Sequence, residues 1–178
     1  SAASDVYKRQ ECESPPCDMP DSEISSIVNT LFARNQASVE GSAIMMSSRN
    51  ITEFLTVVHT TIASPTHVNS TAIAVMTGTL NITNSIVASH TIGISTTTGI
   101  VNEDYNLFYG NGTDLLGAVN SGGNSRTGLN PAFADPTDDD YHLTLGSAAV
   151  DFGVDLGIED DFDGDVRRQG NAPDIGYD

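Results

Sequence analysis

An irregular repeat between Asn29 and Asn111 constrains the fold more than any other feature of this sequence. Four segments share a polar pair, then mostly aliphatic residues, then a small or aromatic residue, and their starts lie 30, 25 and 21 residues apart. They are residues 29–33, 59–63, 84–88 and 105–109. Repeats of about 20 to 30 residues are typical of solenoids, in which each unit buries its apolar face only against its neighbours.

Two further rows of short aliphatic segments keep the same order along the chain. One row follows the first three segments, at residues 42–45, 71–74 and 92–95, and the other precedes the last three, at residues 55–57, 80–82 and 101–103. Three short strands per unit, separated by Gly, Asn, Ser and Thr, are typical of a parallel β-helix. The sequence therefore predicts an all-β fold, a right-handed parallel β-helix of about four irregular coils with an irregular C-terminal cap.

Asparagine at the corners of such coils can hydrogen-bond to its equivalents in neighbouring coils. Asn29 and Asn84 begin two segments of the first row, whereas His59 and Tyr105 begin the other two, so we expect an interrupted ladder at this corner. A β-sandwich of hairpins is the competing architecture, since short strands at regular spacing also fit it and Asn-Gly at 111–112 is a hairpin signal.

The first ten residues, SAASDVYKRQ, look like the translation of a sequencing adapter and are left out of fold reasoning. This resemblance implies a gene cut upstream of Glu11, so that the coils at 11–110 are truncated at their N-terminal end. A genuine unstructured N-terminus is the alternative. Cys12 and Cys17 either close a short loop in an oxidising compartment or stay unpaired, and the sequence leaves both open.

Charge excludes two classes of partner. The chain of 178 residues has a formal net charge of −17, and 13 of its 24 acidic residues lie between Asp135 and Asp178. Such a field repels nucleic acid phosphates and anionic membrane surfaces, so we expect neither as a partner. No stretch approaches the roughly 18 consecutive apolar residues of a membrane-spanning helix, so no membrane span is expected in this chain.

Composition changes after Gly110. Residues 111–130 are rich in Gly, Asn and Ser and are expected to form a connection, and residues 131–178 are expected to form an acidic module. Three strings of this part stand out: NPAFADP at 130–136, DYHLTLGSAAVDFG at 140–153 and DFDGDVRRQGNAPDIG at 161–176.

With these strings the module resembles the choice-of-anchor Q domain, which commonly closes β-helix proteins of the pectate-lyase-like fold. The resemblance implies an extracellular or cell-surface bacterial protein and implies no reaction. We expect the module to cover the open end of the solenoid, where strand edges need a polar cover. Its apolar underside is predicted to contain Phe133, Tyr141, Leu143, Val150, Phe152 and Ile175.

One cluster in the module suits a metal ion. Asp161, Asp163 and Asp165 alternate around a glycine, an arrangement that fits a hard, oxygen-seeking cation such as calcium. The alternative is a turn whose aspartates cap backbone amides or pair with Arg167 and Arg168. Calcium is the single cofactor that the sequence suggests, with these three carboxylates as its ligands.

Catalysis is not favoured by the residues of the coils. Between Glu11 and Tyr109 the basic residues are Arg34 and Arg49, which is few for lysis of an acidic sugar. Hydrolysis needs two facing carboxylates, and we expect Glu103 and Asp104, adjacent on one strand, to point to opposite faces. The four histidines show no metal-ligand spacing and are predicted to be ordinary polar or half-buried residues: His59, His67, His90 and His142.

The sequence therefore favours a noncatalytic surface solenoid for adhesion or glycan contact, with polysaccharides or cell-surface glycans as partners. The alternative is a fragment of a polysaccharide lyase or glycoside hydrolase whose active site lies in upstream coils.

Overall fold

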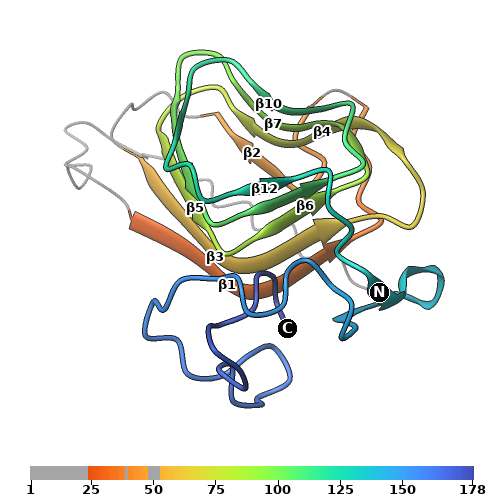
Figure 1. The fold of residues 1–178 in the computed structure, drawn as a ribbon. Helices are drawn as coiled ribbons and strands as arrows, with labels where there is room; N and C mark the ends of the chain where they lie inside the picture. Colours follow the sequence, from red (N-terminus) through yellow and green to blue (C-terminus); the bar gives the residue numbers. More distant parts are fainter. Residues whose placement is uncertain (1–23, 39, 48–52) are drawn as a thin grey trace, which may run out of the picture.

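A computed structural model describes residues 24–38, 40–47 and 53–178 of the chain (Figure 1). Residues 1–10, Cys12 and Cys17, about which the sequence leaves alternatives open, lie outside these ranges. The strands are β1 (Ile24–Ala33), β2 (Ile44–Met46), β3 (Phe54–Ala63), β4 (Val68–Val75), β5 (Thr79–Thr83), β6 (Ile86–Ala88), β7 (His90–Thr96), β8 (Ile100–Asp104), β9 (Leu107–Tyr109), β10 (Thr113–Leu116), β11 (Val119–Ser121), β12 (Arg126–Thr127), β13 (Phe133–Asp135) and β14 (Asp140–Leu143). One short 3-10 helix, η1 (Pro136–Asp138), accompanies them.

The chain winds into an all-β parallel solenoid of about three turns, close to the four coils expected. Its strands stack in three parallel ladders. The first halves of β1 and β3 pair in line with β5, β8 and β11, and the second halves of β1 and β3 pair in line with β6, β9 and β12. The third ladder is β2-β4-β7-β10. The parallel β-helix prediction is confirmed, and the competing hairpin sandwich is wrong.

The register of all three predicted rows is also confirmed. In the first row Phe32 lies beside Ile62, Ile62 beside Val87, and Val87 beside Phe108. The other two rows match in the same way, with Ile44, Ile73 and Ile94 aligned in one and Leu55, Leu80 and Val101 in the other. Register follows from the sequence because a slip by one residue turns every apolar side chain to the other face of its strand.

The corner that begins the first row has a left-handed backbone at all four predicted positions. The φ angles are 47° at Asn29, 46° at His59, 50° at Asn84 and 55° at Tyr105. Asparagine tolerates this conformation better than most residues, which explains its choice at two of the four positions. The backbone conformation of this corner is therefore the same at all four positions, although the residue type differs.

A hydrogen-bonded ladder does run along this corner, one residue later than the expected asparagines. The Thr60 amide donates to the Ser85 hydroxyl at 3.2 Å, the Ser85 amide to Asn106 Oδ1 at 2.9 Å, and the Asn106 amide to the Ser125 hydroxyl at 2.9 Å. Each backbone N–H is thus satisfied by a side chain of the next turn. Asn29 and Asn84 instead point outward, to partners described below.

The solenoid interior is a continuous apolar core. Val57, Ile62, Ile73, Leu80 and Phe108 are essentially inaccessible to solvent, with exposed fractions of 1% or less. Inner positions alternate with outer ones along the strands, as strand geometry requires. This packing is what sets the direction of each outer side chain, including those of the candidate site.

The coils extend past Gly110, where we expected a connection to begin. Residues 111–130 contain β10, β11 and β12, and each adds one strand to a different ladder. β11 places Val119 beside Val101 and Asn120 beside Asn102. The Gly- and Asn-rich composition of this part reflects tight turns between very short strands.

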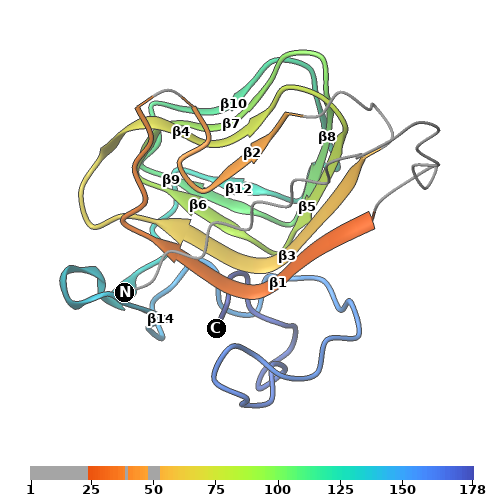
Figure 2. The same ribbon diagram turned by 180° about the vertical axis from the view of Figure 1, so that it is seen from behind.

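The C-terminal segment, residues 131–178, begins with the antiparallel pair β13-β14 and then continues mostly without regular strands. It lies along the outside of the solenoid beneath β1 and β3 (Figures 1 and 2). Its backbone carbonyls accept hydrogen bonds from three turns: Asp160 from Asn29, Val154 from Asn84, and Ala148 from Arg126. These contacts place the segment along a side of the solenoid, whereas the sequence led us to expect it over the open end.

A second apolar cluster fills the space between this segment and the solenoid. On the solenoid side it contains the outward residues Ile86, Ala88 and Leu107, all 1% exposed or less. On the segment side it contains five of the six residues predicted for the apolar underside, Phe133, Tyr141, Leu143, Phe152 and Ile175, together with Tyr177. We call the strands under it (the second halves of β1 and β3, with β6, β9 and β12) the covered ladder.

A long apolar helix that could cross a membrane does not occur among the described residues.

Candidate functional site

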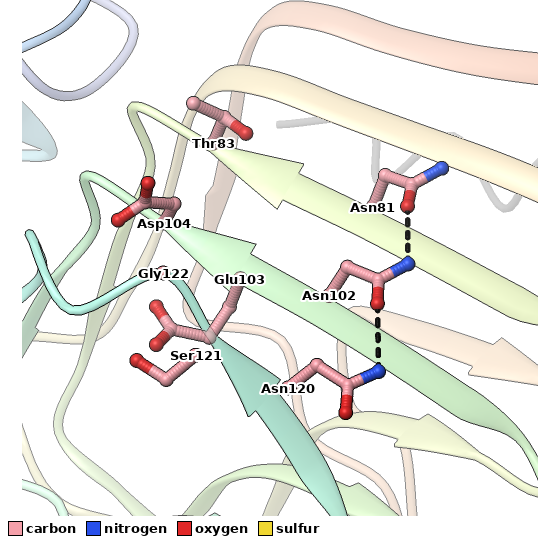
Figure 3. A pocket seen from close by; sticks show the side chains of 8 residues that line it. All are labelled: Asn81, Thr83, Asn102, Glu103, Asp104, Asn120, Ser121 and Gly122. Atoms are coloured by element: carbon pink, nitrogen blue, oxygen red, sulfur yellow. Dashed lines mark hydrogen bonds between the residues drawn. The ribbon is translucent and has the colours of Figure 1, made fainter.

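The ladder beside the covered one has polar residues at the centre of its outer face. On β5, β8 and β11 the outward residue at the centre of the strand is Asn81, Asn102 and Asn120, respectively. We call this ladder, the first halves of β1 and β3 with β5, β8 and β11, the asparagine ladder. A groove of about 370 Å³ lies over its strand ends (Figure 3). This asparagine groove is lined by Asn81, Thr83, Asn102, Glu103, Asp104, Asn120, Ser121 and Gly122.

The three asparagines form a directional chain of amide groups. Asn102 Nδ2 donates to Asn81 Oδ1 at 2.7 Å, and Asn120 Nδ2 donates to Asn102 Oδ1 at 2.9 Å (Figure 3). An asparagine amide has two N–H donors and an oxygen with two lone pairs, so each side chain keeps hydrogen-bonding capacity after these contacts. The row thus offers donors and acceptors at the spacing of successive turns, about 4.8 Å.

Two carboxylates line the groove at the end of β8. Glu103 lies on the inner side and is only 3% exposed, and it accepts hydrogen bonds from Asn106 Nδ2 at 3.1 Å and from the Ser125 hydroxyl. Asp104 is more exposed and accepts from the Tyr105 amide and from the backbone and side-chain nitrogens of Asn124, each at 3.0 Å. Both acids therefore hold the turn after β8 together, from opposite sides of the strand as expected.

Gly122 shapes this end of the groove. A Cβ atom at this position would lie 2.2 Å from Cγ of Asp104, far inside van der Waals contact. The Gly122 amide also donates to the Glu103 carbonyl at 2.9 Å, which fixes the close approach. Glycine lets the backbone of one turn pack directly on the carboxylate of the turn before it, and any side chain here would displace the Asp104 carboxylate.

This arrangement suits recognition of hydroxyl groups better than chemistry. None of the lining residues is basic, so the groove has no cation to neutralise an acidic sugar. The carboxylates are engaged by amides and a hydroxyl, whereas the asparagine amides face outward with hydrogen-bonding capacity to spare. Amides that donate and accept at once are well matched to sugar hydroxyls, which also do both.

The predicted calcium ligands form a self-capped turn. Oδ1 of Asp161 accepts from the amides of Asp163 and Asp165, both at 2.9 Å, and the Asp161 amide donates to the Asp165 carbonyl at 2.9 Å. Asp163 points elsewhere, with Oδ2 at 2.7 Å from Nε2 of His142. Within the described ranges no group of three or more His, Cys, Asp or Glu side chains is placed to hold a metal ion. The contacts match the alternative of a turn with capped amides, and calcium binding stays a prediction.

His142 joins this turn to β14. Its Nδ1 lies 2.6 Å from Oδ1 of Asp140, and its Nε2 faces Asp163. The hydrogen bond to Asp163, and secondarily the one to Asp140, raise the pKa of His142 to about 9. A protonated imidazole therefore bridges two carboxylates, so this histidine is an ion-pair partner, a role that sequence reasoning missed.

The C-terminal segment is locked onto the solenoid by Arg167, which is 5% exposed. Nη2 donates to Asn29 Oδ1 at 2.7 Å, and Nη1 lies 3.0 Å from Nδ1 of His59. The guanidinium also donates to the backbone carbonyls of Gly176, Tyr177 and Asp178. Burial lowers the pKa of Arg167, whose guanidinium has no side-chain carboxylate within ion-pair distance among the described residues.

Burial favours the neutral imidazole of His59 in this lock, and this form accepts a hydrogen bond at one of its two ring nitrogens. Asn84 is oriented by Val154, whose amide donates to Oδ1 at 2.9 Å and whose carbonyl accepts from Nδ2 at 2.7 Å. Nδ2 of Asn84 thereby faces Nε2 of His59 at 3.1 Å as a donor. Burial first, and then the positive charge of Arg167, lower the pKa of His59 to about 3. The corner residues Asn29, His59 and Asn84 are thus docking points of the C-terminal segment.

The remaining histidines have structural surroundings. His90 is 2% exposed, and burial lowers its pKa. His67 Nε2 lies 3.4 Å from the Thr91 hydroxyl on the neighbouring turn. Neither has a described carboxylate or thiol partner.

Sequence reasoning placed Asn81 and Asn102 in the right row but did not single them out, and it missed Asn120. The available signal was the recurrence of asparagine at the centre of Leu-Asn-Ile, Val-Asn-Glu and Val-Asn-Ser. The third triplet lies in the part that we expected to be a connection.

No protein-family model, curated protein or solved structure matches this chain significantly. Function therefore has to be argued from the groove and its chemistry.

Proposed function

We propose that this protein is a noncatalytic extracellular or cell-surface β-helix that contacts glycans through the asparagine groove. The observation that carries the proposal is the outward row of Asn81, Asn102 and Asn120, whose amides stack at the spacing of the turns above a groove of about 370 Å³. Such a row presents a repeating set of donors and acceptors to a repeating ligand. A polysaccharide chain laid across the turns meets these requirements.

Charge favours a neutral glycan. The groove is lined by two acids and no base, and the chain as a whole carries −17. A uronic acid polymer would be repelled by this field and would find no guanidinium or ammonium group to pair with. Neutral sugars bring hydroxyl groups and no charge, so they avoid this cost.

The surface location is supported by the three sequence strings that resemble a choice-of-anchor Q module on a pectate-lyase-like solenoid. The C-terminal segment that contains them packs on the solenoid through the second apolar cluster and Arg167. We propose that this segment stabilises the side of the solenoid next to an anchor, which leaves the asparagine ladder for ligands.

A glycan array with the full chain and two variants tests the proposal. Asn102→Thr keeps a residue that favours strands but breaks the amide row at its centre, and Asn69→Thr makes the same change at an exposed position of β4, outside the groove. We expect the wild type and Asn69→Thr to bind the same neutral glycans and Asn102→Thr to bind them about tenfold more weakly. Equal binding by both variants, or no binding by the wild type, would refute the proposal.

The alternative of a carbohydrate-active enzyme has one specific observation in its favour, since Glu103 and Asp104 line the same groove. Release of reducing ends from a bound polysaccharide by the wild type, and its loss in Asp104→Asn, would establish this alternative. Binding without turnover supports the noncatalytic function.

A further inference from the structure

A second hollow, of about 290 Å³, lies between the solenoid and the start of the C-terminal segment. The solenoid forms one wall with residues at the carboxyl ends of β3, β6 and β9, and the segment around β13 forms the other. Its main lining residues are Ser64, Ala88, Ser89 and Tyr109 from the solenoid, and Asn130 and Phe133 from the segment. It shares no residue with the asparagine groove.

None of the residues that line this hollow is charged, although the chain has 24 acidic residues. The walls combine the half-buried rings of Tyr109 and Phe133 with the small polar side chains of Ser64, Ser89 and Asn130. Apolar rings with a few convergent polar groups are the usual composition of a small-molecule site. The composition favours a neutral ligand over a charged one, because a charge in the hollow would find no partner among the lining residues.

The walls are held in place by hydrogen bonds within the protein. The Ser89 amide donates to the Tyr109 carbonyl at 2.9 Å, and the Val68 amide donates to the Ser89 carbonyl at 2.8 Å. Across the hollow, the carbonyl of Asn130 accepts from the Ala148 amide, and its Oδ1 accepts from the Ala132 amide at 2.9 Å. Phe133 is fixed edge-to-face against Tyr141, with ring centroids 5.1 Å apart.

We propose that this hollow is a binding site for a single neutral sugar ring that stacks on Tyr109. The apolar C–H face of a pyranose covers an aromatic ring, while its hydroxyl groups need the hydroxyls of Ser64 and Ser89 and the amide of Asn130. The volume is close to the lower limit of roughly 300 Å³ for ligand pockets, which fits one ring and not an oligosaccharide. The site is independent of glycan contact at the asparagine groove.

The test uses nuclear magnetic resonance of the full chain titrated with neutral methyl glycosides of glucose, galactose and mannose, and with glucuronate and galacturonate. We expect one or more neutral glycosides to shift the signals of Ser89, Tyr109 and Asn130, and the uronates to shift them less. A second titration uses neutral polysaccharides that end in the same sugar. Shifts with the polysaccharide as well as the glycoside would identify a chain end as a ligand, and shifts with the glycoside alone would identify a free sugar.

Three variants make the test specific. Tyr109→Ala removes the stacking ring, and we expect binding about tenfold weaker. Ser89→Asn adds bulk inside the hollow at a position with φ of 67°, which asparagine tolerates, so this variant keeps the fold and blocks the site. Phe54→Ala removes a partly exposed ring at the opposite end of β3 and should bind as the wild type does.

Equal binding by Ser89→Asn and Phe54→Ala, or no shift at the hollow with any neutral glycoside, would overturn this proposal. Loss of glycan binding in Asn102→Thr, when no neutral glycoside shifts the Tyr109 signal in the wild type, would leave the asparagine groove as the one site and overturn this proposal. Retained shifts at Tyr109 in Asn102→Thr would show that the two sites act separately.

Discussion

The covered ladder and the asparagine ladder are built from the same turns but have opposite outer faces. In the covered ladder, Ile86 and Leu107 point outward and are fully buried under the C-terminal segment. In the asparagine ladder, the corresponding outward residues are Asn81 and Asn102, which stay partly accessible. A parallel strand buried on both faces reads as a continuous apolar run, and one with a wet face alternates. Ile-Val-Ala and Leu-Asn-Ile are these two patterns.

The two outer faces therefore differ in what they contact. The outer residues of the covered ladder pack against the C-terminal segment. Among the described residues, the asparagine ladder packs against no such segment at its centre, yet it repeats asparagine through three turns. A repeated polar residue on an accessible face is better explained by a ligand, or by ladder stability, than by core packing, and the following changes separate these explanations.

The largest expected effect is on the lock of the covered side. Arg167→Met removes a buried guanidinium that satisfies Asn29 and three backbone carbonyls, so we expect a loss of about 3 to 5 kcal/mol in the free energy of unfolding. Arg168→Met is the matched control. Arg168 is exposed and lies 3.7 Å from Asp155, so we expect this substitution to lower the free energy of unfolding by less than about 1 kcal/mol. Chemical denaturation measures both. Equal midpoints would mean that the segment is not held by this lock.

The next effect compares outward residues of the two ladders. Leu107→Ala opens a cavity under the C-terminal segment and should cost about 2 to 4 kcal/mol. Ile100→Ala, at an outward position of β8 that is 50% exposed, should cost less than about 1 kcal/mol. Thermal unfolding of both variants gives the contrast. Similar losses would show that both outer faces are packed.

Acid should loosen the covered side through His59. Its pKa is lowered to about 3 in the folded protein, so as pH falls below the unfolded value of 6.5 the unfolded chain binds a proton that the native state refuses. Stability is therefore full above pH 6.5 and should fall by about 2 kcal/mol by about pH 5. His59→Asn, which suits the left-handed corner, should remove this part of the dependence when denaturation is repeated over that range. A wild-type slope that persists in His59→Asn would assign the effect to other groups.

The smallest expected effect is on the stability of the asparagine ladder. Asn102→Thr breaks two side-chain hydrogen bonds at the surface, and threonine is well suited to a strand, so we expect a loss of about 1 kcal/mol or less. Denaturation of the variant used for glycan binding provides this control. A loss as large as that of Leu107→Ala would make the row a structural ladder and weaken the case for a binding surface.

Much of the solenoid could be predicted because its rule is local. Ile62, Val87 and Phe108 recur with polar or small residues at the turns, and apolar spacing alone fixes which residues stack. The left-handed corner could not be predicted from a sequence pattern, because three different residue types occupy it, at Asn29, His59 and Tyr105. His59 is chosen for its contact with Arg167, which lies 108 residues away in the sequence.

The conformation of the acidic turn, unlike the stacking of the coils, could not be predicted from the sequence. Asp161, Asp163 and Asp165 are compatible with a cation or with capped amides, because carboxylate oxygens serve both purposes. Only the fold shows that Asp161 faces the amides of its own turn and that Asp163 faces His142. The asparagine groove was equally hidden, since Asn120 joins Asn102 only when β11 adds a further strand to the ladder.

The sequence by itself determined the stacking of turns, their register and the acidic character of the C-terminal end, since these follow from periodicity and composition. The tertiary structure decided which side of the solenoid the C-terminal segment covers, and hence which row of outer residues stays accessible to solvent. That choice depends on contacts between residues more than a hundred positions apart, such as Asn29 with Asp160 and Thr61 with Tyr177. No local pattern contains such pairs, because each partner is an ordinary residue in its own segment.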